Sequence, residues 1–146
     1  MVRHLNIKNT QWVMLQQFDD APDGSLFIAE NNKQIPFAIK RVYFINNLEN
    51  KNALRGMHAH KTLEQAIFCI KGSFELELYD GTKEQKVILD NPQKGVYMGP
   101  GVWHAMRGFA ADSILLVISS QPFQEAEYIR DFREFKLFTK KKRTAK

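Results

Sequence analysis

The chain has 146 residues, of which 44% are hydrophobic and 25% charged, and a formal net charge of +5. This length and composition are typical of one globular domain with its own core. The last seven residues, KKKRTAK, carry five positive charges, which leaves 16 basic side chains against 16 acidic ones elsewhere. We therefore expect a domain over residues 1–138, a basic, disordered tail over 139–146, and no nucleic-acid partner.

Cys69 is the single cysteine and stands in the apolar run AIFCI. No disulfide can form within the chain, and a lone thiol in such a run is expected to be part of the core. No apolar run reaches the ~18 residues of a membrane helix, and the first residues show no apolar signal segment. These features predict a cytoplasmic protein without a membrane partner.

Short β-rich segments separated by turn residues follow one another along the chain. The expected strands are residues 25–30, 37–45, 65–70, 73–80, 84–89, 95–99, 103–106 and 113–120. Asp80-Gly81 is a hairpin signal between two of them. Apolar residues recur at helical spacing only in QEAEYIRDFREF, residues 124–135. The pattern predicts an all-β jelly-roll barrel with a short C-terminal helix and an open mouth suited to a small ligand.

Two histidines stand one residue apart in the segment RGMHAHKTLEQ, residues 55–65. If residues 57–61 are extended, His58 and His60 point to one face and Ala59 to the other. Inside an apolar barrel such a pair needs hydrogen bonds or a function. The pair could bind a metal, move protons or lie on the surface.

The surrounding residues match the general cupin pattern. Its elements are His58, His60, Gln65, Gly72, Pro100-Gly101 and His104. In metal-dependent cupins the histidines and a glutamate bind the ion, but the glutamate position holds Gln65, and Glu64 would face the other side of a strand. Three neutral imidazoles alone would still suit zinc. We nevertheless expect no metal and no other cofactor.

A narrower resemblance covers nearly the whole chain up to the tail. The segments KRVYFI, RGMHAHKTLEQ, GPGVWHAM, SILLVIS and EYIRDFREF resemble the nucleotide-linked 4-keto-6-deoxysugar 3,4-ketoisomerases, which are metal-independent cupins. The related dTDP-sugar epimerases of rhamnose synthesis share RGxH but continue with an aromatic residue and glutamine. The resemblance implies a cupin-type fold, a homodimer and a dTDP-linked keto-deoxysugar as substrate. It also implies a role in making 3-amino-3,6-dideoxy sugars for surface polysaccharide such as lipopolysaccharide.

The resemblance assigns roles to the site residues. The reaction would move a carbonyl from C4 to C3 of the sugar of dTDP-4-keto-6-deoxy-D-glucose through an enediol. His58 is the expected base, His60 a second acid-base or orienting group, and Tyr43 the hydroxyl beside the sugar oxygen. The expected substrate-binding residues are Arg41, Arg55, Lys61, Gln65, Trp103, His104 and Arg107. Guanidinium groups suit the pyrophosphate.

The stereochemistry and the reaction class have alternatives. His104, in a turn at the barrel mouth, would lie on the opposite side of the sugar from His58 and favour a galacto product. Asp23 stands where a residue suited to phosphate or sugar is expected, which leaves efficiency and stereochemistry open. The alternatives are a 3- or 5-epimerase, a metal-dependent cupin and a non-catalytic sugar-binding cupin.

Overall fold

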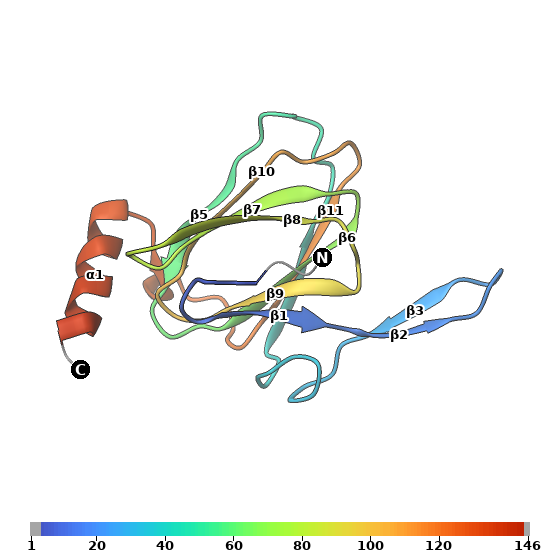
Figure 1. Ribbon diagram of the computed structural model, residues 1–146, viewed down its shortest axis with the longest axis horizontal. Helices are drawn as coiled ribbons and strands as arrows, with labels where there is room; N and C mark the ends of the chain where they lie inside the picture. The colour runs from blue at the N-terminus through green and yellow to red at the C-terminus, as the bar shows by residue number, and fades with distance from the viewer. Residues whose placement is uncertain (1–3, 145–146) are drawn as a thin grey trace.

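The computed structural model describes residues 4–144, which form two antiparallel sheets, a hairpin and a C-terminal helix (Figure 1). The strands are β1 Thr10–Met14, β2 Gln16–Asp19, β3 Ser25–Ile28, β4 Arg41–Ile45, β5 Arg55–His60, β6 Gln65–Lys71, β7 Phe74–Tyr79, β8 Glu84–Leu89, β9 Lys94–Met98, β10 Trp103–Arg107, β11 Ile114–Ser119 and β12 Tyr128–Ile129. The 3-10 turn η1 spans Glu125–Glu127, and the helix α1 spans Phe132–Thr144.

Two five-stranded sheets enclose the core. Their strand orders are β1-β9-β6-β11-β4 and β12-β5-β10-β7-β8. In β7 the apolar residues Phe74, Leu76 and Leu78 are buried while the glutamates between them are half-buried, as expected for a strand with one face on the core. The main cluster of buried residues draws on strands of both sheets. This arrangement confirms the expected all-β, jelly-roll class.

Two N-terminal strands were not predicted from the sequence. Strand β1 pairs with β9, and its residue Val13 is buried. Strand β2 pairs with β3 in a separate hairpin. Neither segment has a strict apolar alternation, so their conformation depends on pairing with strands distant in sequence. The expected strand 37–45 is also shorter than predicted and begins at Arg41.

The expected short C-terminal helix is present, but it begins later in the chain than the helical spacing of residues 124–135 indicated. Residues 128–129 are not helical but form β12, which pairs with β5. The helix begins after Asp131, whose carboxylate accepts hydrogen bonds from the N–H groups of Arg133 and Glu134. It continues to Thr144, so residues 139–144 are helical rather than disordered; residues 145–146 lie outside the described part. Thr139 is buried beside Gly81, which gives this end of the helix a packing partner.

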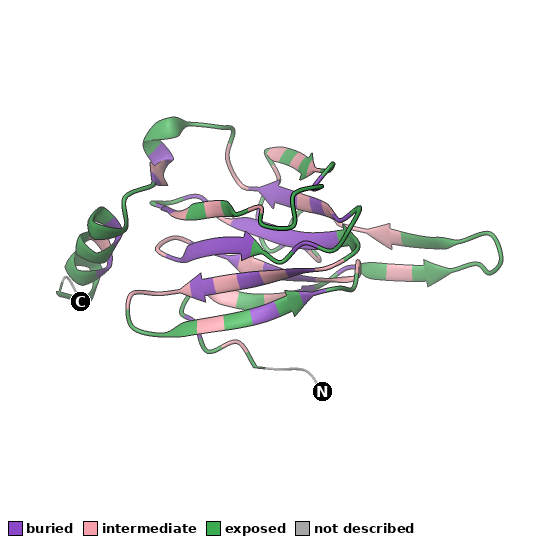
Figure 2. Ribbon diagram, turned by 90° about the horizontal axis from the view of Figure 1, so that it is seen from above, coloured by how far each residue is buried: buried purple, intermediate pink, exposed green. Residues whose placement is uncertain are grey.

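Helix α1 and the β2–β3 hairpin lie at opposite ends of the molecule (Figures 1 and 2). Phe135 of the helix packs with Ala59, Trp103 and Ile129 on the outer face of the second sheet. The hairpin projects from the body and is largely exposed (Figure 2). Within residues 4–144, no helix is long and apolar enough to cross a membrane.

Candidate active site

Three histidines meet between the two sheets. His58 and His60 come from β5, and His104 comes from the neighbouring strand β10, directly opposite His58. The ring centroid of His58 lies 5.0 Å from that of His60 and 4.6 Å from that of His104. The expected common face of His58 and His60 is confirmed, and Ala59 packs on the other face.

A β-bulge in β5 shapes this cluster. Gly56 pairs with Ala105 and His58 with His104, so Met57 is the extra residue; Gly56 and Met57 both have positive φ angles, of 81° and 61°. A side chain at Gly56 would meet the carbonyl of His104 at 2.9 Å, so glycine is required there. Because of the bulge, Arg55 and His58 line the same cavity although three positions apart.

Hydrogen bonds fix the tautomers of two of the rings. Nδ1 of His58 lies 3.0 Å from the Gly56 carbonyl, and Nδ1 of His104 lies 3.2 Å from the Val102 carbonyl. A carbonyl only accepts, so both Nδ1 atoms carry the proton and both Nε2 atoms present a lone pair. Nε2 of His104 accepts from the side-chain amide of Gln65, at 3.1 Å.

The buried polar atoms of the cluster are incompletely satisfied. His60, His104 and Gln65 are each no more than 3% exposed. Among the described residues, neither ring nitrogen of His60 has a hydrogen-bond partner, and neither does Oε1 of Gln65. His104 therefore lies inside the sandwich on β10, not in a turn at its mouth as the sequence suggested. Polar atoms left open in a buried pocket are expected where a ligand binds.

A small cavity of about 90 Å³ separates His58 and His104 from the first sheet; His60 does not line it. It is lined by Tyr43, Arg55, Gln65, His58 and His104, all residues to which the resemblance assigned a role. Tyr43 projects inward from β4, whereas its neighbours along the strand, Val42 and Phe44, are exposed. The cavity thus brings together five of the expected residues, including His58, whose imidazole carries a free lone pair.

Tyr128 is a site residue that the sequence did not reveal. Its ring lies 4.9 Å from that of His58 and 4.6 Å from that of His60. Its hydroxyl accepts a hydrogen bond from Arg41 at 3.2 Å, and the Arg41 guanidinium lies 5.3 Å from the Tyr43 ring. Pairing of β12 with β5 puts Tyr128 opposite His60. The sequence analysis missed Tyr128 because this segment has apolar residues at helical spacing, whereas its pairing with β5 makes it a strand.

Burial dominates the electrostatics of the site. It lowers the pKa of His58 to about 4 and, together with the nearby His58 and Arg41, that of His60 to about 3. The pKa of His104 is held well below its ordinary value by burial. Burial raises the pKa of Tyr43 to about 12. At neutral pH the three imidazoles are therefore uncharged bases and the phenol keeps its proton.

Three of the predicted substrate-binding residues lie away from the cluster. Trp103 faces the outside of the second sheet and packs against Phe132, with ring centroids 5.1 Å apart. Arg107, on the same outer face, pairs with Glu77 at 2.8 Å. Lys61 is exposed in the turn after β5. Asp23 also lies away from the cluster, exposed in the loop of the β2–β3 hairpin.

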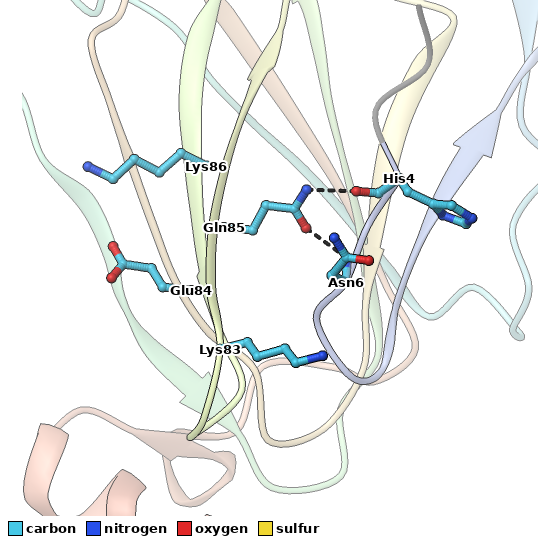
Figure 3. A pocket seen from close by; sticks show the side chains of 6 residues that line it. All are labelled: His4, Asn6, Lys83, Glu84, Gln85 and Lys86. Atoms are coloured by element: carbon cyan, nitrogen blue, oxygen red, sulfur yellow. Dashed lines mark hydrogen bonds between the residues drawn. The ribbon is translucent and has the colours of Figure 1, made fainter.

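A larger hollow of about 760 Å³ lies elsewhere, along the edge strand β8 (Figure 3). Its lining residues are His4, Asn6, Lys83, Glu84, Gln85 and Lys86. The side chain of Gln85 is occupied, because it donates to the His4 carbonyl and accepts from the Asn6 N–H. This open, polar surface lacks the converging groups of the histidine pocket, so we assign the chemistry to the smaller cavity.

A jelly-roll sandwich with a histidine cluster between its sheets defines a cupin-type protein. A family model described as "FdtA: WxcM-like, C-terminal" matches residues 8–140. A curated relative, the TDP-4-oxo-6-deoxy-alpha-D-glucose-3,4-oxoisomerase of Aneurinibacillus thermoaerophilus, is 45% identical over 118 residues, covering 81% of this chain and 84% of that one. The chain belongs to this FdtA/WxcM-like family.

Solved structures give the same assignment. A variant of the 3,4-ketoisomerase QdtA from Thermoanaerobacterium thermosaccharolyticum, in complex with TDP-4-keto-6-deoxyglucose, superposes with a TM-score of 0.89 at 34% identity, over 92% of this chain and 96% of that one. The TDP-quinovose 3,4-ketoisomerase WlaRB of Campylobacter jejuni gives 0.85 at 41% identity, over 90% and 99%. The resemblance to the 3,4-ketoisomerases is confirmed.

Proposed function

We propose that this protein is a sugar-nucleotide 3,4-ketoisomerase that converts dTDP-4-keto-6-deoxy-D-glucose into a dTDP-3-keto-6-deoxyhexose. The observation that carries the proposal is the uncharged His58, whose Nε2 lone pair is free beside a cavity also lined by Tyr43. The names of the 45% identical relative and of the structural neighbours support this reaction. A 3-keto sugar is the compound that later amination at C3 requires, which supports a place in amino-sugar synthesis.

The isomerisation needs only proton transfers. His58 removes the proton from C3 while O4 gains one, which gives the 3,4-enediol. C4 then gains a proton and O3 loses its own, which leaves the carbonyl at C3. No electrons leave the sugar, so we propose that the reaction uses neither a redox cofactor nor a metal. The lowered pKa of His58 supports the base role because it keeps the ring unprotonated at neutral pH.

Tyr43 and the arginines complete the proposed site. A phenol whose pKa is raised to about 12 holds its proton and can donate it to O4 as the enediol forms. Arg55 lines the cavity and is exposed on its other side, where a pyrophosphate could reach it. Arg41 lies beside Tyr43, and its buried Nε has no partner within the described residues. Both guanidinium groups suit phosphate oxygens.

The configuration at C4 depends on which group delivers the proton there. His104 was the expected donor of a galacto product. Its Nδ1 faces the Val102 carbonyl and its Nε2 faces the Gln65 amide, so it has no free N–H. His60, whose ring nitrogens have no partner in the described chain, is better suited to exchange a proton with the sugar. We keep the galacto product as our proposal, with His60 as donor.

Product analysis tests the function directly. The protein is incubated with dTDP-4-keto-6-deoxyglucose in deuterium oxide and the product is examined by NMR. We expect the carbonyl at C3, deuterium at C4 and a galacto configuration. A carbonyl that stays at C4, with deuterium at C3 or C5, would instead establish an epimerase, and no turnover would leave a binding protein.

Two matched variants test the assigned base. His58→Asn should lower kcat at least about 100-fold, the scale of a lost general base. His4→Asn changes the same residue type in the hollow along β8 and should keep full activity. Full activity after exhaustive chelation is the expected result for a reaction without metal.

A homodimer is the proposed assembly. On the edge strand β4, Val42 and Phe44 are 57% and 63% exposed. On the projecting hairpin, the paired residues Phe18 and Leu26 are also more than half exposed. Apolar side chains on sheet edges favour association with another copy of the chain. The pyrophosphate-linked substrate supports a cytoplasmic location.

A further inference from the structure

Helix α1 carries the net charge of the protein. Its residues include six basic side chains and one acid, Glu134, which leaves 15 basic and 15 acidic residues in the rest of the chain. The basic residues of the helix are Arg133, Lys136, Lys140, Lys141, Lys142 and Arg143. The helix lies at one end of the molecule, opposite the projecting β2–β3 hairpin (Figure 1). The excess of positive charge is therefore concentrated at that end.

The helix turns one face toward the body of the protein and the other toward solvent (Figure 2). On the inward face, Phe135 and Thr139 are buried. Residues three or four positions apart share the opposite face, and they are exposed. We refer to Arg133, Leu137, Lys140 and Lys141 as the outward face of α1. Leu137 is 60% exposed and lies about one helical turn from each of the three cations.

The cations of the outward face have no acidic partner. The salt bridges within residues 4–144 involve other basic residues, and none includes Arg133, Lys140 or Lys141. Lys136 and Lys142 flank this face, each with its ammonium group over a phenyl ring of the helix. Unpaired cations around an exposed leucine are complementary to a surface that offers negative charge and, just below it, an apolar layer.

We propose that the outward face of α1 attaches the protein to an anionic lipid bilayer. Clusters of about four to eight Lys and Arg residues on a helix bind anionic headgroups, and each residue strengthens the binding about fivefold. The central Leu137 favours lipid over nucleic acid, because the phosphates of a nucleic acid cover no apolar layer that could receive it. The sequence-based expectation of no membrane partner rested on the lack of a spanning segment, and attachment to the surface of a bilayer needs none.

Sedimentation with vesicles tests the attachment, on the full chain without substrate. We expect binding to vesicles of phosphatidylglycerol and phosphatidylcholine in equal parts and none to vesicles of phosphatidylcholine alone. Raising NaCl from about 0.1 M to about 1 M should weaken the binding at least tenfold, because the screening length falls from about 10 Å to about 3 Å. The triple variant Arg133→Gln, Lys140→Gln, Lys141→Gln should bind about 100-fold more weakly. Leu137→Gln, which removes the apolar contact alone, should bind about fivefold more weakly.

The matched control removes three positive charges elsewhere. Lys40, Lys51 and Lys71 are exposed and lie outside α1, and their joint replacement by Gln should change the affinity less than about threefold.

Several outcomes would overturn the proposal. No binding to the anionic vesicles would do so, as would binding that is independent of salt or that the helix triple variant retains in full. Equal weakening by the control variant would show attraction by total charge instead of by α1. Binding of a DNA duplex that depends on the three helix cations, without binding of vesicles, would make nucleic acid the partner. Because no substrate is present, failure of this test leaves the proposed function untouched.

Discussion

Tyr128 connects the uncharged histidines of the site to the Arg41 guanidinium. Its ring contacts both histidines of β5, and its hydroxyl accepts from Arg41. The same guanidinium lies over Tyr43. Tyr128 therefore links Arg41 to the two histidines of β5.

Tyr128→Phe should separate binding from chemistry. The change keeps the ring packing but removes the acceptor of the Arg41 hydrogen bond, an effect of about 1–2 kcal/mol. We expect KM for the nucleotide sugar to rise about tenfold with kcat changed less than threefold, measured by steady-state kinetics. Tyr97→Phe is the control, because Tyr97 loses a comparable bond to Glu64 away from the histidines. An unchanged KM would contradict the proposed role of Arg41 in binding the substrate.

The sequence predicted some of these residues and not others for physical reasons. Alternation along a strand placed His58 and His60 on one face, and the structure agrees. The same rule puts Trp103 and His104 on opposite faces, so they could not both line the pocket. Tyr128 depends on a long-range strand pairing, which no local pattern encodes.

At the scale of elements, Glu127 ties η1 to the turn after β5. Its carboxylate accepts from the N–H groups of Thr62 and Leu63 and from the Thr62 hydroxyl. Its own carbonyl accepts from the N–H of Lys61. This acid thus anchors the end of the strand that carries the histidines.

Glu127→Gln should destabilise the fold by about 1–3 kcal/mol, the range for losing hydrogen bonds to a charged acceptor. Burial raises the pKa of Glu127, but the N–H donors of Thr62 and Leu63 outweigh it and hold the pKa below its ordinary value. The stabilisation is therefore complete above the unfolded pKa, about 4.3, and is lost as pH falls through the lower folded value.

Urea unfolding at pH 7 and at pH 3 measures this effect. The difference between wild type and Glu127→Gln should shrink at the lower pH. Glu125→Gln is the control, because Glu125 lies on the surface with Arg130 and its change should have little effect on stability. A pH-independent difference would contradict the role of the ionised carboxylate.

Elements with a strong periodic signal were the ones predicted well. Strand β7 alternates along its whole length and was placed correctly. Strands β1 and β2 lack that alternation, so no local pattern predicted them. The segment 124–135 has apolar residues at helical spacing, yet residues 125–127 form a 3-10 turn and residues 128–129 are held extended by pairing with β5. Tertiary pairing there overrides local propensity.

At the scale of the whole molecule, the exposed apolar edge of β4 leads to a test of assembly. Within the described chain, β4 pairs with β11 alone, so one edge is open. Phe44→Asp puts a charge on this surface without touching the inward-facing Tyr43. We expect the wild type to elute as a dimer and Phe44→Asp as a monomer, measured by light scattering after size exclusion.

The control for this test is Leu137→Asp, a comparably exposed apolar residue on α1. It should leave the dimer intact. If Phe44→Asp remains a dimer of unchanged stability, the interface lies on another face.

The back-to-back placement of Trp103 and His104 on β10 gives the molecule an optical reporter. The chain has two tryptophans, and the other, Trp12, lies under the ammonium group of Lys94, 3.9 Å from its ring. Trp12→Phe leaves Trp103 as the single indole fluorophore, one peptide bond from the pocket yet outside it. Its emission can then follow occupancy of the pocket in real time, without a label on the sugar and without blocking its entry.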